Sequence, residues 1–361
     1  MELAFFGFSY LLLFISIFNY FSIRTPADPA SISGSVTVLL PVRNEENNVA
    51  DCISGIQSQQ GVPDLRVIII NDQSTDKTAE FAQNAIASDS RFSIINTEGL
   101  RDGWLGKVSA LQTGYEAAHS DYIITLDADV RLEPTAIAAS VNLLEETKLD
   151  FVSPYPLQIA VSLAEKLIQP LLHWSWMTTV ILRLAEKFPN TSTAVANGQL
   201  FVARKSALDK VDGFTSVQNK ILDDIEIARS LIKAGYRGTV AEGSEIACTR
   251  MYRNFSEIKE GYGKSLHKAF GGLLGTVIAV AFIFITGVLP VIYILQGSPL
   301  GWLVYASIVF TRLLSDTKSK SDSFFALLHP LSSIVLIYLI INSWAKRGTI
   351  QWKGRIVCPA M

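Results

Sequence analysis

Hydrophobic and polar positions divide the chain into three regions. Nearly uninterrupted apolar runs occur at Leu3–Ile23 and from Ala269 to Trp344, whereas short apolar runs alternate with polar stretches between them. About 20 consecutive apolar residues are enough for a helix to cross a bilayer. The pattern therefore predicts one soluble domain flanked by membrane segments. The predicted regions are residues 1–24, 34–262 and 263–361.

The N-terminal run could be a cleaved signal peptide or an uncleaved anchor. A signal peptide carries a basic segment before a short apolar core, but the charge that leads this run is Glu2. The run is also longer than such a core. We therefore predict an uncleaved membrane anchor.

Two to three hydrophobic helices are predicted near the C-terminus. Ala269–Leu295 is nearly uninterrupted, with a kink expected at Pro290, and Phe324–Trp344 is a further span. Leu300–Leu314 is shorter and could cross the membrane with strain or lie partly in the interface. Three spans after a cytoplasmic domain would leave the basic segment 345–355 outside, against the positive-inside tendency.

The central region alternates short β-branched runs with stretches of helical periodicity. The predicted strands are "SVTVLLPV", "LRVIIIND", "FSIINT" and "DYIITLDAD". Nearly continuous apolar strands separated by helices predict an α/β domain with a mostly parallel sheet covered on both faces. Ser74 or Thr75 is expected to cap the second helix, and Pro134 is expected in the first turn of the helix that follows the fourth strand.

Polar clusters follow three of these strands. "PVRNEE" follows the first strand, "NDQSTD" the second and "LDADV" the fourth. Taken alone, Asp127 and Asp129 could form a solvated turn. Two carboxylates this close stay ionised together most easily when a cation compensates them. Ligands bind beyond the carboxyl ends of parallel strands, so the convergence of the clusters favours a binding site.

Composition supports a membrane-associated protein and excludes some functions. Charged residues make up 18% of the chain, below the roughly 25% of soluble domains, and the mean hydropathy is +0.30. A net charge of −2 gives no reason to expect a nucleic-acid partner. Cys52, Cys248 and Cys358 are far apart, so neither a disulfide framework nor a cysteine metal site is predicted.

The ordered motifs resemble the family 2 glycosyltransferases, which have the GT-A fold. The resemblance covers about Val36 to Arg237 and rests on "PVRNEENNVADCISGIQSQ", "IIINDQSTDKT", "GWLGKVSALQTG", "LDADVRLEP", "NGQLFVARKSALDKVDGF" and "ILDDIEIARSLIKAGYR". "GWLGK" and "RMYRNFSEIKEGYGKS" are similar to the membrane-anchored branch that glycosylates carotenoid or hopanoid lipids, including the diaponeurosporenoate glucosyltransferases. The QxxRW motif of processive polysaccharide synthases is absent, and Arg250 and Arg253 occupy roughly its region.

The resemblance implies a donor site for a nucleotide sugar, a UDP-sugar by this comparison. Its residues would be Pro41, Arg43 and Glu45 around the nucleoside, Asp72 on the base, Lys107 near the phosphates and Asp127 on part of the ribose. Simpler interpretations are a helix-entry turn for Asp72 and a surface position for Lys107.

The resemblance also implies a divalent cation, Mg²⁺ or Mn²⁺, held chiefly by Asp129 with Asp127. Oxygen ligands suit these ions. Asp224 matches the catalytic base and Asp223 its acidic neighbour, where the family commonly has Glu. An acid at a helix N-terminus, favoured by the dipole alone, is the alternative for Asp224.

The acceptor side would include Gly198, Gln199, Arg250 and Arg253. The segment "LIQPLLHWSWMTTVILRL" could lie in the membrane interface and guide a lipid, or pack on the catalytic domain. A hydroxyl acceptor needs a base, whereas a carboxylic acid is already ionised at neutral pH.

The function expected from these residues is transfer of one sugar, with inversion, to a lipid. The catalytic domain would lie on the cytoplasmic side of a multi-pass protein in the cell membrane. A polysaccharide synthase and a catalytically silent membrane protein of the same fold are the alternatives.

Overall fold

The computed structural model describes residues 2–27, 29, 31–347, 351–352 and 355–356. It contains two compact units, which we describe separately. The α/β unit comprises Arg24–Leu157 and Leu184–Thr249, and the helical unit comprises Met1–Ile23, Gln158–Arg183 and Arg250–Met361. Residues 158–183 thus cluster with the helices, although the sequence pattern groups them with the soluble domain.

A seven-stranded sheet in the order β3-β2-β1-β4-β8-β6-β9 forms the centre of the α/β unit. Strand β8 runs antiparallel to β4 and β6, and the remaining pairs are parallel. The predicted fold class, with its mostly parallel sheet, is therefore confirmed. The strands are β1 (Val36–Val42), β2 (Leu65–Asn71), β3 (Phe92–Asn96), β4 (Tyr122–Leu126), β6 (Phe151–Tyr155), β8 (Leu200–Arg204) and β9 (Gly238–Glu242).

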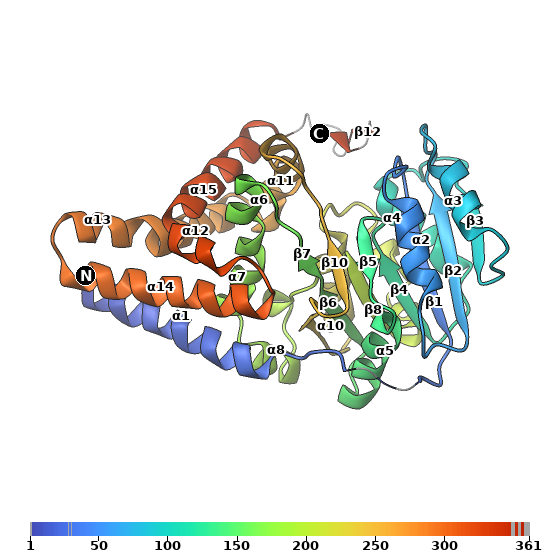
Figure 1. The fold of residues 1–361 in the computed structure, drawn as a ribbon, viewed down its shortest axis with the longest axis horizontal. Helices are drawn as coiled ribbons and strands as arrows, with labels where there is room; N and C mark the ends of the chain where they lie inside the picture. Colours follow the sequence, from blue (N-terminus) through green and yellow to red (C-terminus); the bar gives the residue numbers. More distant parts are fainter. Residues whose placement is uncertain (1, 28, 30, 348–350, 353–354, 357–361) are drawn as a thin grey trace. The chain divides into compact units, whose positions relative to one another are not determined.

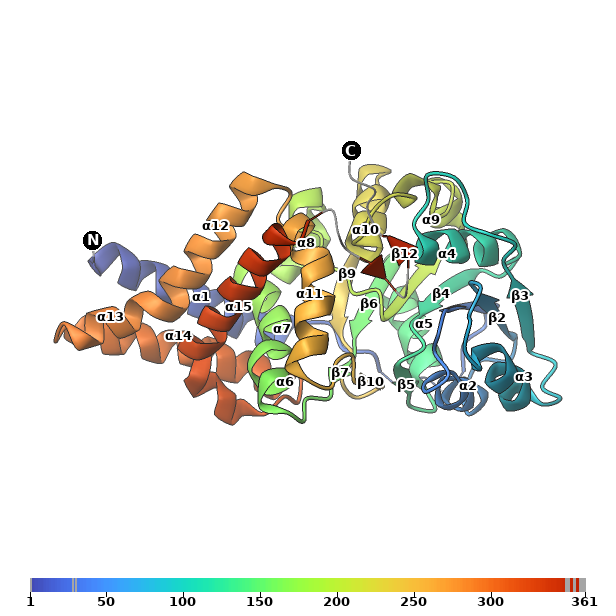
Figure 2. The same cartoon turned by 90° about the horizontal axis from the view of Figure 1, so that it is seen from above.

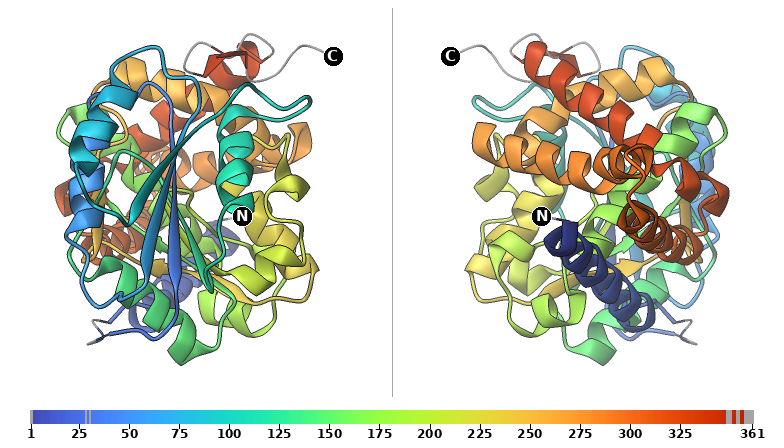
Figure 3. Two further views of the ribbon diagram at one scale, coloured as in Figure 1. Left: turned by 90° about the vertical axis from the view of Figure 1, so that its right-hand side faces the viewer. Right: turned by 90° about the vertical axis from the view of Figure 1, so that its left-hand side faces the viewer.

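Helices cover both faces of this sheet (Figure 3). Alternate side chains of β1 belong to two different hydrophobic cores. Val38 and Leu40 share one core with residues of α2, α3 and α5, whereas Leu39 shares the other with residues of α4 and α10. This alternation follows from the period of two along a strand. The helices are α2 (Val49–Gln57), α3 (Thr78–Ile86), α4 (Gly106–Glu116), α5 (Ala136–Thr147), α9 (Lys205–Asp209), α10 (Asp223–Lys233) and the short η1 (Thr191–Thr193) and η2 (Thr215–Val217).

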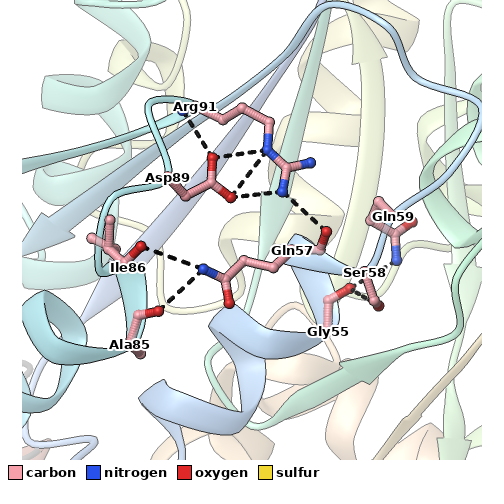
Figure 4. A network of polar contacts seen from close by, with 8 residues as sticks. All are labelled: Gly55, Gln57, Ser58, Gln59, Ala85, Ile86, Asp89 and Arg91. Atoms are coloured by element: carbon pink, nitrogen blue, oxygen red, sulfur yellow. Dashed lines mark hydrogen bonds and ion pairs between the residues drawn. The ribbon is translucent and has the colours of Figure 1, made fainter.

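A polar network joins the C-terminal ends of α2 and α3 (Figure 4). The Arg91 guanidinium forms an ion pair with Asp89 at 2.7 Å and donates from Nη2 to the carbonyl of Gln57 at 3.0 Å. Gln57 in turn donates from Nε2 to the carbonyl of Ala85 at 3.1 Å. These bonds satisfy carbonyls that a helix end leaves without an intrahelical partner.

A small antiparallel pair follows the aspartates of the fourth strand. It joins β5 (Val130–Leu132) to β10 (Ala247–Thr249), with Thr249 opposite Val130. The chain passes from one unit to the other within strand β7 (Leu157–Gln158) and within helix α8 (Leu182–Lys187).

Two local expectations about helix starts were wrong. Helix α3 begins at Thr78 rather than after Ser74 or Thr75, and its N-cap position, Lys77, makes no side-chain capping bond. Instead, Ser74 Oγ accepts from the backbone N–H of Asn44 at 3.1 Å, which joins two loops. Pro134 lies in the turn before α5 and not in the helix, which starts at Ala136.

Among the described residues of the helical unit, three segments are long and apolar enough to cross a membrane: Ala4–Ser22, Leu273–Leu295 and Ser323–Ala345. These agree with three of the predicted segments. The fourth, Leu300–Leu314, belongs to helix α14 (Pro299–Lys318), which is not among the helices apolar enough to cross a membrane. A π-helical turn precedes Pro290 within the second segment.

Helices α1 and α14 run side by side (Figures 1 and 2). The helical unit consists of α1 (Glu2–Ser22), α6 (Leu163–Ile168), α7 (Pro170–Thr179), α11 (Phe255–Ala269), α12 (Leu273–Ile283), η3 (Phe284–Val288), α13 (Leu289–Leu295), α14 (Pro299–Lys318), η4 (Ser323–Leu328) and α15 (His329–Ala345), with a short pair β11 (Gln351–Trp352) and β12 (Arg355–Ile356). Cys358 and part of the basic segment lie outside the described residues.

Helix α7 packs inside the helical unit. Trp174 and Trp176 are buried, and Trp174 Nε1 donates to Thr311 Oγ1 of α14 at 2.8 Å. The tryptophans of this segment are therefore part of a helical core. Helix α14 also carries Arg312 and Asp316, which are fully buried one turn apart with 3.6 Å between Nη2 and Oδ2.

Candidate active site

The three predicted polar clusters meet at one edge of the sheet. Strands β1, β2 and β4 are parallel neighbours, so the residues that follow them come together. Arg43, after β1, donates from Nη1 to the carbonyl of Asp72 at 2.6 Å and lies 4.0 Å from its carboxylate. Pro41 is the penultimate residue of β1 and pairs in register with Ile70 of β2.

Asp72 is buried and held by polar contacts at this edge. Only 4% of the residue is exposed, and Oδ1 accepts from Thr97 Oγ1 at 3.2 Å. Thr97 directly follows β3, so it joins the same edge, although the sequence analysis did not single it out. Glu45 donates its backbone N–H to Thr78 Oγ1 at 2.7 Å, and its carboxylate accepts from Asn48 Nδ2 at 2.8 Å.

Lys107 connects the aspartates of two distant segments. Its Nζ lies 2.8 Å from Oδ1 of Asp127, at the end of β4, and 3.9 Å from Oδ2 of Asp223, at the start of α10. Burial lowers the pKa of Lys107, whereas the negative charges of Asp127, Asp223 and Asp224 raise it. The effect of the charges is larger, so the net shift of the pKa is upward. The ammonium is therefore a fixed positive charge between the two segments.

Asp129 follows Asp127 by two residues and, like it, is half-buried. Burial, followed by the charges of Asp127 and Glu45, raises the pKa of Asp129 to about 6. The charge of Lys107 opposes this shift. Thr249 ends β10 opposite Val130, the residue that follows Asp129, and no sequence motif marks it, so only the pairing of β10 with β5 places it here.

Asp224 is held by two backbone donors. Its Oδ2 accepts from the N–H of Gly198 and its Oδ1 from the N–H of Ile225, both at 2.8 Å. Burial, followed by the charge of Asp223, raises the pKa of Asp224 to about 6. Burial also raises the pKa of Asp223 itself. The pair thus combines an oriented carboxylate with an acidic neighbour.

The segment of Gly198 and Gln199 links the two carboxylate groups. The backbone N–H of Asp127 donates to the carbonyl of Gln199 at 3.1 Å. A Cβ added to Gly198 would lie 3.3 Å from both Asp224 Cβ and Lys107 Nζ, so a larger residue would crowd both groups. Gln199 accepts from Asn197 Nδ2 through Oε1 at 3.0 Å.

Arg250 and Arg253 belong to the helical unit rather than to the unit that holds these carboxylates. The Arg250 guanidinium contacts both oxygens of Glu165, at 3.0 and 3.3 Å, near the start of α6. The sequence analysis did not identify this buried glutamate as a partner. Arg253 is exposed, and its backbone N–H donates to Glu257 Oε2 at 2.8 Å.

The family comparison covers most of the α/β unit. Residues 37–212 match the family model described as Glycosyl transferase family 2. The chain carries a family 2 glycosyltransferase domain. It is therefore an enzyme of the transferase class, as the motifs predict. The match includes Asp72, Lys107, Asp127 and Asp129 but ends before Asp223.

Curated relatives match this glycosyltransferase over most of their length. The chain is 26% identical over 340 residues to a 4,4'-diaponeurosporenoate glycosyltransferase of Staphylococcus aureus, covering 89% of this chain and 88% of the relative. The protein of that name from a second strain is 26% identical over 344 residues with the same coverage. The similarity thus extends beyond the family domain into the segments around it.

A solved structure shares the fold of the glycosyltransferase. The mannosyltransferase PcManGT from Pyrobaculum calidifontis, in complex with GDP-Man and Mn²⁺, superposes with a TM-score of 0.57 at 17% identity. The superposition covers 95% of each chain. It therefore supports the GT-A architecture of the α/β unit together with its accompanying helices.

Proposed function

We propose that this glycosyltransferase moves a single sugar from a nucleotide-sugar donor to a lipid acceptor of the carotenoid or hopanoid type, with inversion at the anomeric carbon. The observation that carries the proposal is the connection of Asp127 through Lys107 to the Asp223–Asp224 pair. It brings a donor-side carboxylate and a candidate base into one site. The relatives named for a carotenoid acid support the lipid class.

The donor half of the site is the carboxyl edge of β1, β2 and β4. Asp72 is buried there and can accept a hydrogen bond from the N–H of a base or from a sugar hydroxyl. Arg43 and Glu45 lie at the same edge through their contacts with the loop after β2 and the start of α3. A UDP-sugar is the donor that we propose for this edge.

The chemistry of Asp127 and Asp129 fits a divalent cation. Mg²⁺ and Mn²⁺ prefer carboxylate oxygens, and Mg²⁺ commonly takes one or two of them and completes its shell with water and substrate phosphates. When bound, the ion would neutralise charge on the departing diphosphate.

Asp224 is the proposed base on the acceptor side. Its carboxylate is oriented by the backbone of Gly198 and Ile225, which leaves its remaining lone pairs for the acceptor. It would take the proton as an acceptor hydroxyl attacks the anomeric carbon, and a single direct displacement inverts that carbon. For a carboxylate acceptor, Asp224 would orient the nucleophile without removing a proton.

We further propose a multi-pass protein of the cell membrane with the α/β unit on the cytoplasmic side. The support is the three apolar segments and the lysines of α11, Lys264 and Lys268, that precede the second segment. Protease added to intact spheroplasts should leave the α/β unit uncut. Complete digestion without permeabilisation would place the unit outside.

Lipid analysis tests the proposed activity most directly. Membranes containing the wild-type protein would be incubated with UDP-hexoses and the lipid extract analysed by mass spectrometry. One added hexose mass on a lipid is expected, and it should be strongly reduced with Asp129→Asn. A polymer ladder would indicate a polysaccharide synthase, and unchanged lipids together with intact donor would contradict catalysis.

A further inference from the structure

Lys107 has a position that the helix carrying it does not favour. It is the second residue of α4, and the first turn of α4 contains no acidic residue and no side-chain cap. The positive end of a helix dipole repels a cation in the first turn. The compensation for Lys107 therefore comes from outside its own helix.

The compensating groups are carboxylates from β4 and α10. Nζ contacts Asp127 Oδ1 at 2.8 Å and lies 3.9 Å from Asp223 Oδ2. About a quarter of the Lys107 side chain is exposed, so solvent screens these charges only in part. The absence of a side chain on Gly198 leaves room for the ammonium beside Asp224.

The contact between Lys107 and Asp127 places an ammonium on a carboxylate that a divalent cation would also use. A metal ion that uses Asp127 must share this carboxylate with an ammonium, and two cations on one carboxylate repel each other. The diphosphate of a nucleotide carries negative charge that can contact both cations. A bound nucleotide therefore reduces the repulsion between the ammonium and the metal ion, whereas this repulsion persists when the metal ion binds alone.

We propose that Lys107 competes with the divalent cation for Asp127 and thereby makes metal binding depend on a bound nucleoside diphosphate. This inference rests on the metal and donor sites of the proposed function. Lys107 acts as a positioning residue: it delays the loading of metal until the phosphates draw its ammonium away. Reciprocally, metal and nucleotide strengthen each other's binding by the same factor.

The test measures binding of Mn²⁺ without turnover. The electron paramagnetic resonance signal of free Mn²⁺ would be titrated with wild type, Lys107→Met and Lys107→Arg, each with and without UDP. Wild type should bind Mn²⁺ weakly alone and more tightly with UDP, by a factor in the range of roughly 5 to 150. Lys107→Met should bind Mn²⁺ alone more tightly than wild type and should therefore show a smaller increase of affinity with UDP.

Two variants separate charge from structure. Lys107→Arg keeps the positive charge and should retain the weak binding of Mn²⁺ alone. Lys205→Met removes an ammonium that pairs with Asp209 on α9, and it should titrate like wild type. Melting curves of all variants confirm that the compared proteins are folded.

The outcomes distinguish this inference from the proposed function. Equal affinity of wild type and Lys107→Met for Mn²⁺ alone, with binding in the presence of UDP intact, would overturn only the competition by Lys107. Failure of every protein to bind Mn²⁺ even with UDP would overturn both the metal site and the competition.

Discussion

The backbone N–H of Gly198 donates a hydrogen bond of 2.8 Å to Oδ2 of Asp224. The two residues are 26 positions apart in the chain, and the bond connects the segment before β8 with the first turn of α10. Because the bond fixes one oxygen and the N–H of Ile225 fixes the other, the carboxylate has a defined orientation before any substrate binds. The first prediction follows from that orientation.

Asp224→Asn should impair transfer while sparing donor binding, because Asp72 and Lys107, which we propose for the donor, lie on other elements. A general base typically contributes about 10²–10⁴-fold, so a hydroxyl acceptor should lose activity on that scale. A carboxylate acceptor has no proton to lose and should be affected less. Transfer rates to a hydroxyl lipid and to a carotenoid acid, together with UDP affinity, provide the measurement. Wild-type rates with both acceptors would show that Asp224 is not the base.

The transfer rate to a hydroxyl acceptor should depend on pH through Asp224. Burial raises the pKa of this carboxyl to about 6, so it holds its proton below that pH and cannot act as a base. The rate should therefore fall as the pH decreases through about 6, by roughly tenfold per unit well below the pKa. A pH–rate profile at saturating donor and Mn²⁺ tests this. The acidic fall should be absent from the residual rate of Asp224→Asn, and a flat wild-type profile would contradict the assignment.

Asp129→Asn should abolish most transfer with the fold retained. The amide keeps the size of the side chain but removes a charge that Mg²⁺ or Mn²⁺ requires, and a catalytic metal supplies several kcal/mol of charge stabilisation. We expect a loss of at least about 10²-fold. Asp121→Asn is the matched control, since Asp121 precedes β4 and pairs with Ser35 away from the site. Full activity of Asp129→Asn in excess EDTA would exclude the metal role.

Arg312→Met should destabilise the helical unit strongly. Arg312 and Asp316 are both fully buried, so removing the guanidinium leaves a buried carboxylate unpaired, which typically costs about 3–5 kcal/mol. The double variant Arg312→Met/Asp316→Leu removes both charges and should recover most of this loss. Unfolding in detergent, analysed as a double-mutant cycle, measures the coupling.

Lys264→Met is the control for the loss of an exposed ion pair on a helix. Lys264 pairs with Glu260, whose side chain is 71% exposed, and such pairs contribute about 0–1 kcal/mol. A double variant whose loss of stability equals the sum of the losses of Arg312→Met and Asp316→Leu would show that the two buried charges are not energetically coupled.

The sequence by itself determined the class of fold and the edge of the sheet that holds the carboxylates. Apolar β-branched runs such as residues 65–71 form strands because both of their faces are buried, and helical periodicity between them requires parallel pairing. Residues that follow neighbouring parallel strands must meet at one edge, so Asp72 and Asp127 could be placed together from local pattern alone. The apolar segments were readable because membrane spanning depends on length and composition.

Only the tertiary structure decided which distant groups touch. The bond from Gly198 to Asp224, the pairing of Thr249 with Val130 and the contact of Lys107 with Asp127 join residues that no local periodicity relates. The same holds for the grouping of residues 158–183 with the helical unit. Such contacts depend on how separate elements pack, because the orientation of each side chain is set by neighbours far away in the chain.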